Sequence, residues 1–190
     1  MIGNIAAGLY GVGVTPSTNS YESIATVSVG AGGSSTISFT SIPSTYKHLQ
    51  IRTMSRVTGA GSGAQDSYIY FNSDTTDSNY YSHQLYGTGS SAGAGGGNSS
   101  GNGGIISQTN GGTGSVFGVG IMDILDYATA NKNRVCRTLG GVDSNSTNGF
   151  IELTSVLWNN TAAITSITIK PTSGTDFMQY SSFALYGIKD

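Results

Sequence analysis

Apolar and polar residues alternate with a period of two along most of the chain. This period is typical of β-strands that bury one face and expose the other. Ten segments carry the alternation: 21–29, 35–39, 48–57, 68–71, 80–86, 116–125, 135–139, 150–158, 164–169 and 182–188. Strands of this length, separated by Gly, Asn, Ser and Asp, predict an all-β domain, which could be a sandwich, a jelly roll or a barrel.

The phase of the alternation predicts which side chains share a face. In segment 48–57 we expect Leu49, Ile51 and Val57 to point inward, and Gln50, Arg52 and Arg56 outward. Other apolar sets on one side are Ile37 with Phe39, Ile167 with Ile169, Phe183 with Leu185, Tyr21 with Ala25, Val27 and Val29, and Val119 with Ile121 and Leu125. Segment 126–132 is the one candidate helix and could equally be a polar turn.

Residues 87–115 differ from the rest of the chain because they are rich in Gly, Ser and Asn and have few side chains able to pack. Taken alone, such a segment is a flexible linker. Within a compact domain it is a long loop, which is usually functional or disordered, or it is ordered by a neighbouring subunit. We expect residues 1–18 to form an N-terminal arm and residues 19–190 a single β-sandwich domain that contains this loop.

The composition narrows the possible functions. Only 9% of the 190 residues are charged, so the exposed faces of several helices could not be formed, and helical bundles are excluded. The net charge of −2 lacks the basic footprint of a nucleic-acid binder. No apolar run is long enough for a membrane-spanning helix, and the N-terminus lacks the basic start of a secretory signal. We therefore expect neither nucleic acid nor membrane as a partner.

Catalytic and cofactor motifs do not stand out in the sequence. The chain has no Gly-Lys pair for a nucleotide P-loop, and its only histidines, His48 and His83, lie in strand-like segments. The carboxylates show no spacing that singles out a catalytic pair. The single cysteine, Cys136, excludes an internal disulfide and is expected to be a small packed residue. We expect a protein that is not an enzyme and has no catalytic residue, cofactor or structural metal.

The polar stretch 72–79 offers several oxygen ligands of the kind that calcium prefers, including Asp74 and Asp77. It lacks the regular aspartate spacing and the bidentate glutamate of a strong calcium loop. A hairpin turn held by Asx-type hydrogen bonds is the favoured interpretation.

Tyrosine is the most frequent aromatic residue, and its ring combines a large contact area with a polar group. Tyr80, Tyr86, Trp158 and Tyr180 are candidate partner-binding residues that could line an outward face for a saccharide or a protein. The favoured interpretation is that tyrosines fill the sandwich interior or a subunit interface.

Several segments resemble small structural proteins of tailed bacteriophages, cyanophages among them. The segments are Tyr10 to Gly13, Pro16 to Thr18, Tyr21 to Val27, Phe39 to Tyr46, His48 to Arg52 and Ser181 to Lys189. The resemblance spans nearly the whole chain. It implies a jelly-roll-like antiparallel β-sandwich, commonly trimeric, displayed on a capsid or tail, and it carries over no functional residues.

Together these observations favour a non-enzymatic virion protein, a capsid decoration (cement) protein that bridges capsid subunits and stabilises the shell. Its expected partners are further copies of itself, the major capsid protein and other virion proteins, and its expected location is the virion, after synthesis in the host cytoplasm. Residues 1–18 are the candidate arm that docks onto the shell. The alternative function is a tail-fibre or tail-associated adhesin that binds a host surface glycan, and a cell-wall-degrading enzyme is a third.

Overall fold

The computed structural model describes residues 20–59, 63–98, 103–112, 114–144, 149–172 and 175–189. These residues form an all-β structure, as the alternation predicts, and the expected arm over residues 1–18 lies outside them. The strands are β1 (Tyr21–Ser28), β2 (Ile37–Phe39), β3 (His48–Val57), β4 (Ala64–Gln65), β5 (Ser67–Phe71), β6 (Tyr80–Gly87), β7 (Ala92–Asn98), β8 (Ser107–Thr109), β9 (Gly118–Leu125), β10 (Arg134–Val142), β11 (Phe150–Trp158), β12 (Ile167–Pro171) and β13 (Ser182–Ile188).

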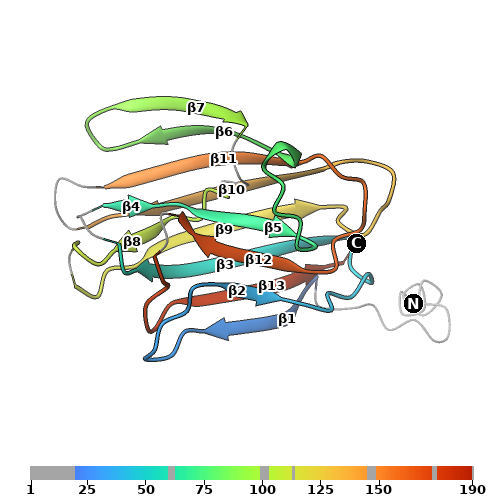
Figure 1. Ribbon diagram of the computed structural model, residues 1–190, viewed down its shortest axis with the longest axis horizontal. Helices are drawn as coiled ribbons and strands as arrows, with labels where there is room; N and C mark the ends of the chain where they lie inside the picture. The colour runs from blue at the N-terminus through green and yellow to red at the C-terminus, as the bar shows by residue number, and fades with distance from the viewer. Residues whose placement is uncertain are drawn as a thin grey trace, which may run out of the picture.

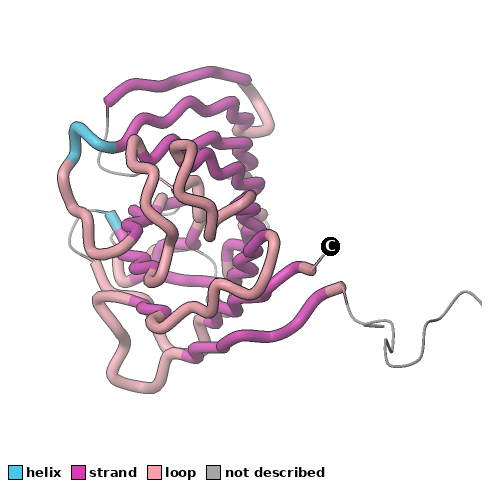
Figure 2. Tube along the Cα trace, turned by 90° about the vertical axis from the view of Figure 1, so that its right-hand side faces the viewer, coloured by secondary structure: helices cyan, strands magenta, loops and turns pink. Residues whose placement is uncertain are grey.

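Two antiparallel sheets form a sandwich (Figure 1). Eight strands of the large sheet follow the order β1-β13-β3-β9-β10-β11-β6-β7, and the small sheet has the order β2-β12-β5. Figure 2 shows the small sheet on one side of the large sheet. The jelly-roll part of the expectation is not confirmed, because the strands are divided eight and three between the two main layers, with the short β4 and β8 at one end.

The hydrophobic core lies between the sheets, as expected from burying one face of each. Leu49, Ile51, Val57, Phe183 and Leu185 point inward and are fully buried, which confirms the predicted phase of their strands. Further core residues are Ile37, Phe39, Ile69, Phe71, Met122, Ile124, Cys136, Val156, Trp158, Ile167 and Ile169. Cys136 is a packed residue as predicted, and burial raises the pKa of its thiol to about 12.

Two predicted orientations are wrong for local reasons. A β-bulge between Ser23 and Ala25 shifts the register of β1, so Tyr21 lies on the opposite side of the sheet from Ala25 and is 47% exposed. Arg56, expected outward, is buried because its guanidinium group donates hydrogen bonds to the carbonyl oxygens of Asn110 (3.0 Å) and Gly112 (3.3 Å).

The glycine-rich range 87–115, expected to be a loop, contains two strands. β7 pairs along its whole length with β6, although its sequence is largely glycine. Residues 103–109 are buried, and β8 pairs with β3 and β4. Buried polar groups pair at this end of the sandwich: the hydroxyl groups of Ser55 and Ser107 lie 2.6 Å apart.

The segment before β8 can pass over the large sheet because glycines lie beneath it. A Cβ atom at Gly118 would lie 2.3 Å from the carbonyl oxygen of Ile106, and a Cβ at Gly140 would lie 2.8 Å from that of Gly104. Neither distance is possible for a real side chain. These two glycines therefore allow a glycine-rich segment to become part of the interior.

We expect Gly118→Ala to lower the free energy of unfolding by about 1–3 kcal/mol, since the backbone at Ile106 must move to admit the methyl group. Urea denaturation followed by circular dichroism measures the change. Gly30→Ala is the matched control, because nothing lies within 4 Å of the added methyl group, and we expect no loss of stability there. Equal midpoints for the two variants would contradict the close packing at Gly118.

Candidate functional site

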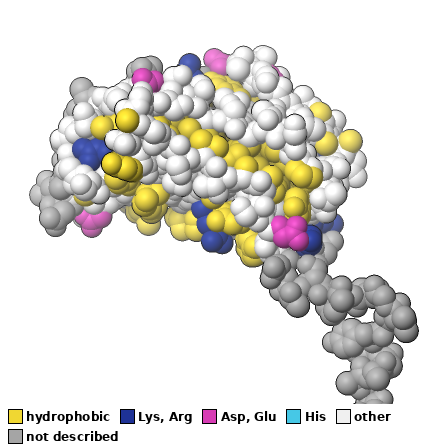
Figure 3. Space-filling view, turned by 90° about the horizontal axis from the view of Figure 1, so that it is seen from below, with side chains coloured by type: hydrophobic (Ala, Val, Ile, Leu, Met, Phe, Trp, Pro, Cys, Tyr) yellow, Lys and Arg dark blue, Asp and Glu magenta, His cyan; other side chains and the backbone are white. Residues whose placement is uncertain are grey.

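The second face of the large sheet is apolar, and no described segment covers it. We call this surface the outer face. Ten large apolar side chains on it are 40–61% exposed. They are Met54, Tyr81, Leu85, Val119, Ile121, Leu125, Val135, Leu139, Ile151 and Leu153. Figure 3 views the molecule from the β1 edge, so the outer face is seen in profile; hydrophobic side chains reach the surface, with charged groups beside some of them.

The strand register arranges the outer face in rows. Ile121, Leu139, Leu153 and Leu85 lie directly opposite one another on β9, β10, β11 and β6, which makes a continuous aliphatic row across four strands. Side chains directly opposite on antiparallel strands lie within contact distance. The row is therefore one apolar surface and not a scatter of isolated residues.

A polar row runs beside the aliphatic row. The Gln50 side-chain amide donates a hydrogen bond to Asp123 Oδ1 (2.9 Å), and Arg137 Nη2 lies 3.4 Å from Asp123 Oδ2. Arg52 Nε donates to Gln50 Oε1 (2.9 Å), and its guanidinium carbon lies 5.0 Å from the centre of the Tyr186 ring. The charged groups of this row thus already contact groups of opposite or complementary polarity within the chain.

A groove of about 710 Å³ indents one end of the outer face. Gly141 lies between Val119 and Ile151 in the register, so no side chain fills the surface at that point. The apolar residues that line the groove include Phe117, Val119, Ile121, Leu139, Phe150 and Ile151, and Arg52 and Asp143 supply its charged groups. A hollow of this composition suits a hydrophobic group of a partner.

The four aromatic residues predicted to bind a partner do not form one surface. Tyr80 is fully buried and Trp158 is 1% exposed, so an outward-facing role is wrong for these two, and they fill the interior as the favoured interpretation predicts. Tyr86 is half-buried and stacks on Phe150, with ring centroids 5.7 Å apart. Tyr180 is 70% exposed in the turn before β13. Only Tyr180 is left as a prominent exposed ring of the four.

Tyr80 and Trp158 instead hold the turn at residues 72–79. Trp158 Nε1 donates to Asp74 Oδ2 (2.8 Å), and the Tyr80 hydroxyl group donates to the Asp74 carbonyl oxygen (2.9 Å). Asn79 also donates to Asp74 Oδ2 (2.8 Å), and the backbone N–H of Thr76 donates to Oδ1 (3.1 Å). Both carboxylate oxygens of Asp74 thus accept hydrogen bonds from the protein, in agreement with the favoured turn and not with a calcium loop.

The electrostatics of Asp74 follow from these contacts. Burial works against its charged form, but the hydrogen bonds from Trp158, Asn79 and Thr76 outweigh burial and lower the pKa of the carboxyl group. Within the described part of the chain, no cluster of three or more His, Cys, Asp or Glu side chains could hold a metal ion.

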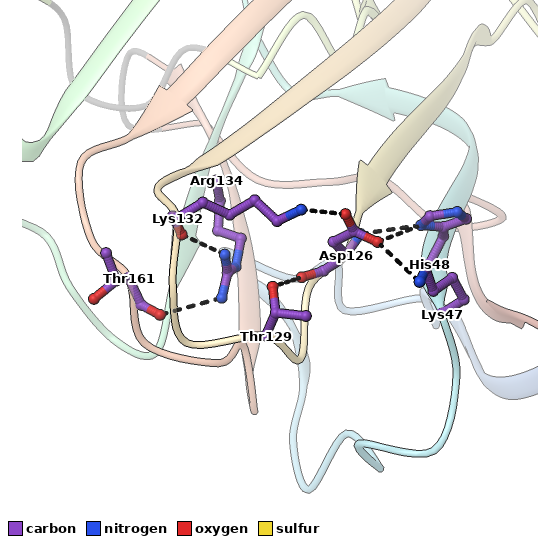
Figure 4. A network of polar contacts seen from close by, with 7 residues as sticks. All are labelled: Lys47, His48, Asp126, Thr129, Lys132, Arg134 and Thr161. Atoms are coloured by element: carbon purple, nitrogen blue, oxygen red, sulfur yellow. Dashed lines mark hydrogen bonds and ion pairs between the residues drawn. The ribbon is translucent and has the colours of Figure 1, made fainter.

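Asp126 joins the end of β9 to β3 in a second polar cluster (Figure 4). Its carboxylate pairs with Lys132 and lies 3.8 Å from Lys47 Nζ, and the hydrogen bond from Lys132 is the main reason that its pKa is lowered. The segment 126–132 is a polar turn and not a helix. Arg134 closes the turn by donating to the carbonyl oxygens of Lys132 and Thr161.

His48 takes part in this cluster in a structural role. Its Nδ1 accepts a hydrogen bond from the backbone N–H of Asp126 (3.0 Å). In a catalytic triad the histidine Nδ1–H instead donates to the carboxylate, which orients the ring as a base. In this protein the hydrogen bond from Asp126 to His48 instead joins β3 to the turn after β9.

Glu152 is a buried carboxyl group on the inner face of β11, 1% exposed. Its Oε1 accepts a hydrogen bond from the Thr154 hydroxyl group, and Oε2 has no hydrogen-bond partner among the described residues. Burial, together with the negative charge of Asp66, raises the pKa of Glu152 to about 7. Because the carboxyl group is buried in the fold, its raised pKa makes the stability of the protein depend on pH.

Comparisons with protein-family models, with curated proteins and with solved structures return no match. Among the described residues, no helix is long and apolar enough to cross a membrane. The candidate functional site is therefore identified from the geometry alone: it is the outer face, with its exposed apolar residues and its groove.

Proposed function

We propose that this chain is a non-enzymatic structural protein of a tailed-bacteriophage virion, and that it acts as a capsid decoration (cement) protein. The observation that carries the proposal is the outer face. Exposed apolar patches of this extent mark interaction sites on soluble proteins. The charges on the polar row are few and already have partners within the chain: Arg137 pairs with Asp123, and Arg52 contacts Gln50 and Tyr186, which favours burial in an assembly over contact with a charged small molecule.

The viral context of the proposal comes from the sequence resemblance, and the composition agrees with it. Surfaces rich in uncharged Ser, Thr and Asn can be buried between subunits without leaving a charged group buried and unpaired. Symmetric assemblies repeat each contact many times, so modest interfaces add up through avidity. In this proposal the outer face and the open sheet edges at β1 and β7 make contacts within the shell, and residues 1–18 dock the protein onto it.

The tail-fibre adhesin receives less support. That function needs an exposed concave surface rich in Tyr and Trp, and two of the four candidate rings, Tyr80 and Trp158, lie in the core. The apolar side chains that line the groove at one end of the outer face are mainly aliphatic, whereas saccharide sites combine aromatic rings with polar groups.

Copy number per purified virion tests the function. Quantitative mass spectrometry against the major capsid protein should give a stoichiometry comparable to that protein, hundreds of copies in all, because icosahedral symmetry multiplies a lattice component. A handful to a few dozen copies would place the protein in the tail and favour the adhesin. Absence from the particle would contradict both virion functions.

A further inference from the structure

The outer face has the size of a complete protein interface. At roughly 80 Å² for each of its ten half-exposed side chains, it offers about 800 Å² of apolar surface, the area that each partner contributes to a standard stable interface. The largest apolar patch on a typical monomer is only about 300–600 Å². The face is therefore large enough to hold one partner without help from other surfaces.

The charges on the face are suited to self-association. Its polar row holds both signs, with Asp123 beside Arg137 on the adjacent strand. When two such faces meet about a two-fold axis, the Asp123 and Arg137 side chains of one copy can pair with those of the other. A strongly acidic or strongly basic partner would meet groups of its own sign as well as groups of the opposite sign. The chain's net charge of −2 adds little repulsion between copies.

The shape of the face selects two copies over three. Stacked sheets pack about 10 Å apart, so side chains of two facing sheets interdigitate over their whole area. An eight-stranded sheet is about 38 Å wide, and three such sheets around a three-fold axis would each lie about 11 Å from that axis. Leucine and isoleucine side chains reach only about half the 10 Å spacing, so a three-fold arrangement would leave its centre unfilled.

We propose that the outer face packs against the outer face of a second copy of this chain, forming a two-fold symmetric dimer. The contact is isologous, so the aliphatic row of each copy lies on the apolar surface of the other. The inference deepens the proposed function, because it identifies the first partner in the assembly. It differs from the trimer that the resemblance implies, since it assigns this face to a two-fold contact.

The test is the mass of the purified full chain, measured by sedimentation velocity over a range of concentrations. We expect twice the mass of the chain. Two separate variants, Leu139→Glu and Leu153→Arg, each place one charge at the centre of the face, negative in the first and positive in the second. In a symmetric dimer each variant therefore brings two like charges into the interface. Both should raise the dissociation constant at least about a hundredfold, because a charge would be buried without a partner.

Ser38→Arg is the matched control, since it adds a charge to an exposed position of β2, in the small sheet on the other side of the molecule. It should leave the dissociation constant unchanged. Leu139 and Leu153 are 53% and 43% exposed, so both variants should keep the circular dichroism spectrum of a folded chain. If a variant fails to fold, the wild-type mass still decides the question.

Three results would overturn the proposal: a monomer at about 100 µM, a trimer, or a dimer that survives both substitutions. These outcomes are separate from the test of the proposed function. A monomer in solution that is present in hundreds of copies on the virion would leave the decoration function intact and assign the face to another virion protein. A dimer in solution that is absent from the virion would support the two-fold contact and contradict the decoration function.

Discussion

Trp158→Ala should lower the free energy of unfolding by about 4–5 kcal/mol, a large part of the roughly 5–15 kcal/mol that stabilises a typical domain. Trp158 is 1% exposed, packs against Phe71 with ring centroids 5.5 Å apart, and donates a hydrogen bond to Asp74. The substitution leaves a cavity and removes one donor from a carboxylate that must stay charged. Both effects act in the same direction.

Denaturant titration followed by far-ultraviolet circular dichroism measures this loss, because the chain has a single tryptophan and its fluorescence disappears with it. All variants should be compared at one protein concentration, since association would shift the midpoints. Trp158→Phe separates the two effects: it keeps most of the packing and loses the donor, and should cost about 1–2 kcal/mol. Tyr180→Ala, at a 70% exposed ring, should stay within about 0.5 kcal/mol of wild type. A loss below about 2 kcal/mol for Trp158→Ala would contradict its place in the core.

Glu152→Gln should make the protein more stable than wild type above pH 7. The folded pKa of Glu152 is about 7, above its ordinary value of 4.5, so between these values the folded chain holds a proton that the unfolded chain has lost. The stabilising contribution of this group is fully present below pH 4.5, falls as pH rises, and is gone above pH 7. The total change is about 3 kcal/mol, and glutamine, which is neutral at every pH, removes it.

The measurement is the difference in free energy of unfolding between Glu152→Gln and wild type from pH 4 to pH 8. We expect it to be small at pH 4 and to grow to about 3 kcal/mol at pH 8. Glu22→Gln is the matched control, since the hydrogen bonds from Lys189 and Tyr46 lower the pKa of Glu22. Its contribution is present above its ordinary pKa and is lost as the pH falls, so this variant should be the less stable one at neutral pH. A pH-independent difference for Glu152→Gln would show that the carboxyl group reaches solvent.

Most strands could be predicted from the sequence because their apolar residues obey the period of two. Phe183 with Leu185 and Ile167 with Ile169 identify β13 and β12 without any tertiary information. β7 could not be found this way, since its residues are mostly glycine and strand propensity argues against it. It is held by backbone pairing to β6, where a Cβ at Gly96 would lie 2.4 Å from the His83 ring. The His83 and Tyr86 rings lie over Gly96 and Gly93 of β7, and these contacts can be recognised only when the pairing of β6 with β7 is known.

The outer face was missed for a related reason. In β9 to β11 both alternating sets contain apolar residues, for example Ile121 beside Met122. The pattern predicted Ile121 on one side with Val119 and Leu125, but it could not decide which side the small sheet would cover. Apolar residues at both phases are the signal in the sequence: one set is buried within the chain, and the other forms the exposed face that we propose is covered by a second copy.

The burial of Cys136 has a practical consequence for chemists. Its thiol is fully buried and its pKa is raised to about 12, so little reactive thiolate forms at neutral pH. We therefore expect Cys136 in the folded chain to react only very slowly with maleimides and other thiol reagents. One cysteine introduced at a chosen exposed position would become the unique attachment point for a fluorophore or a displayed peptide, without first removing the native residue.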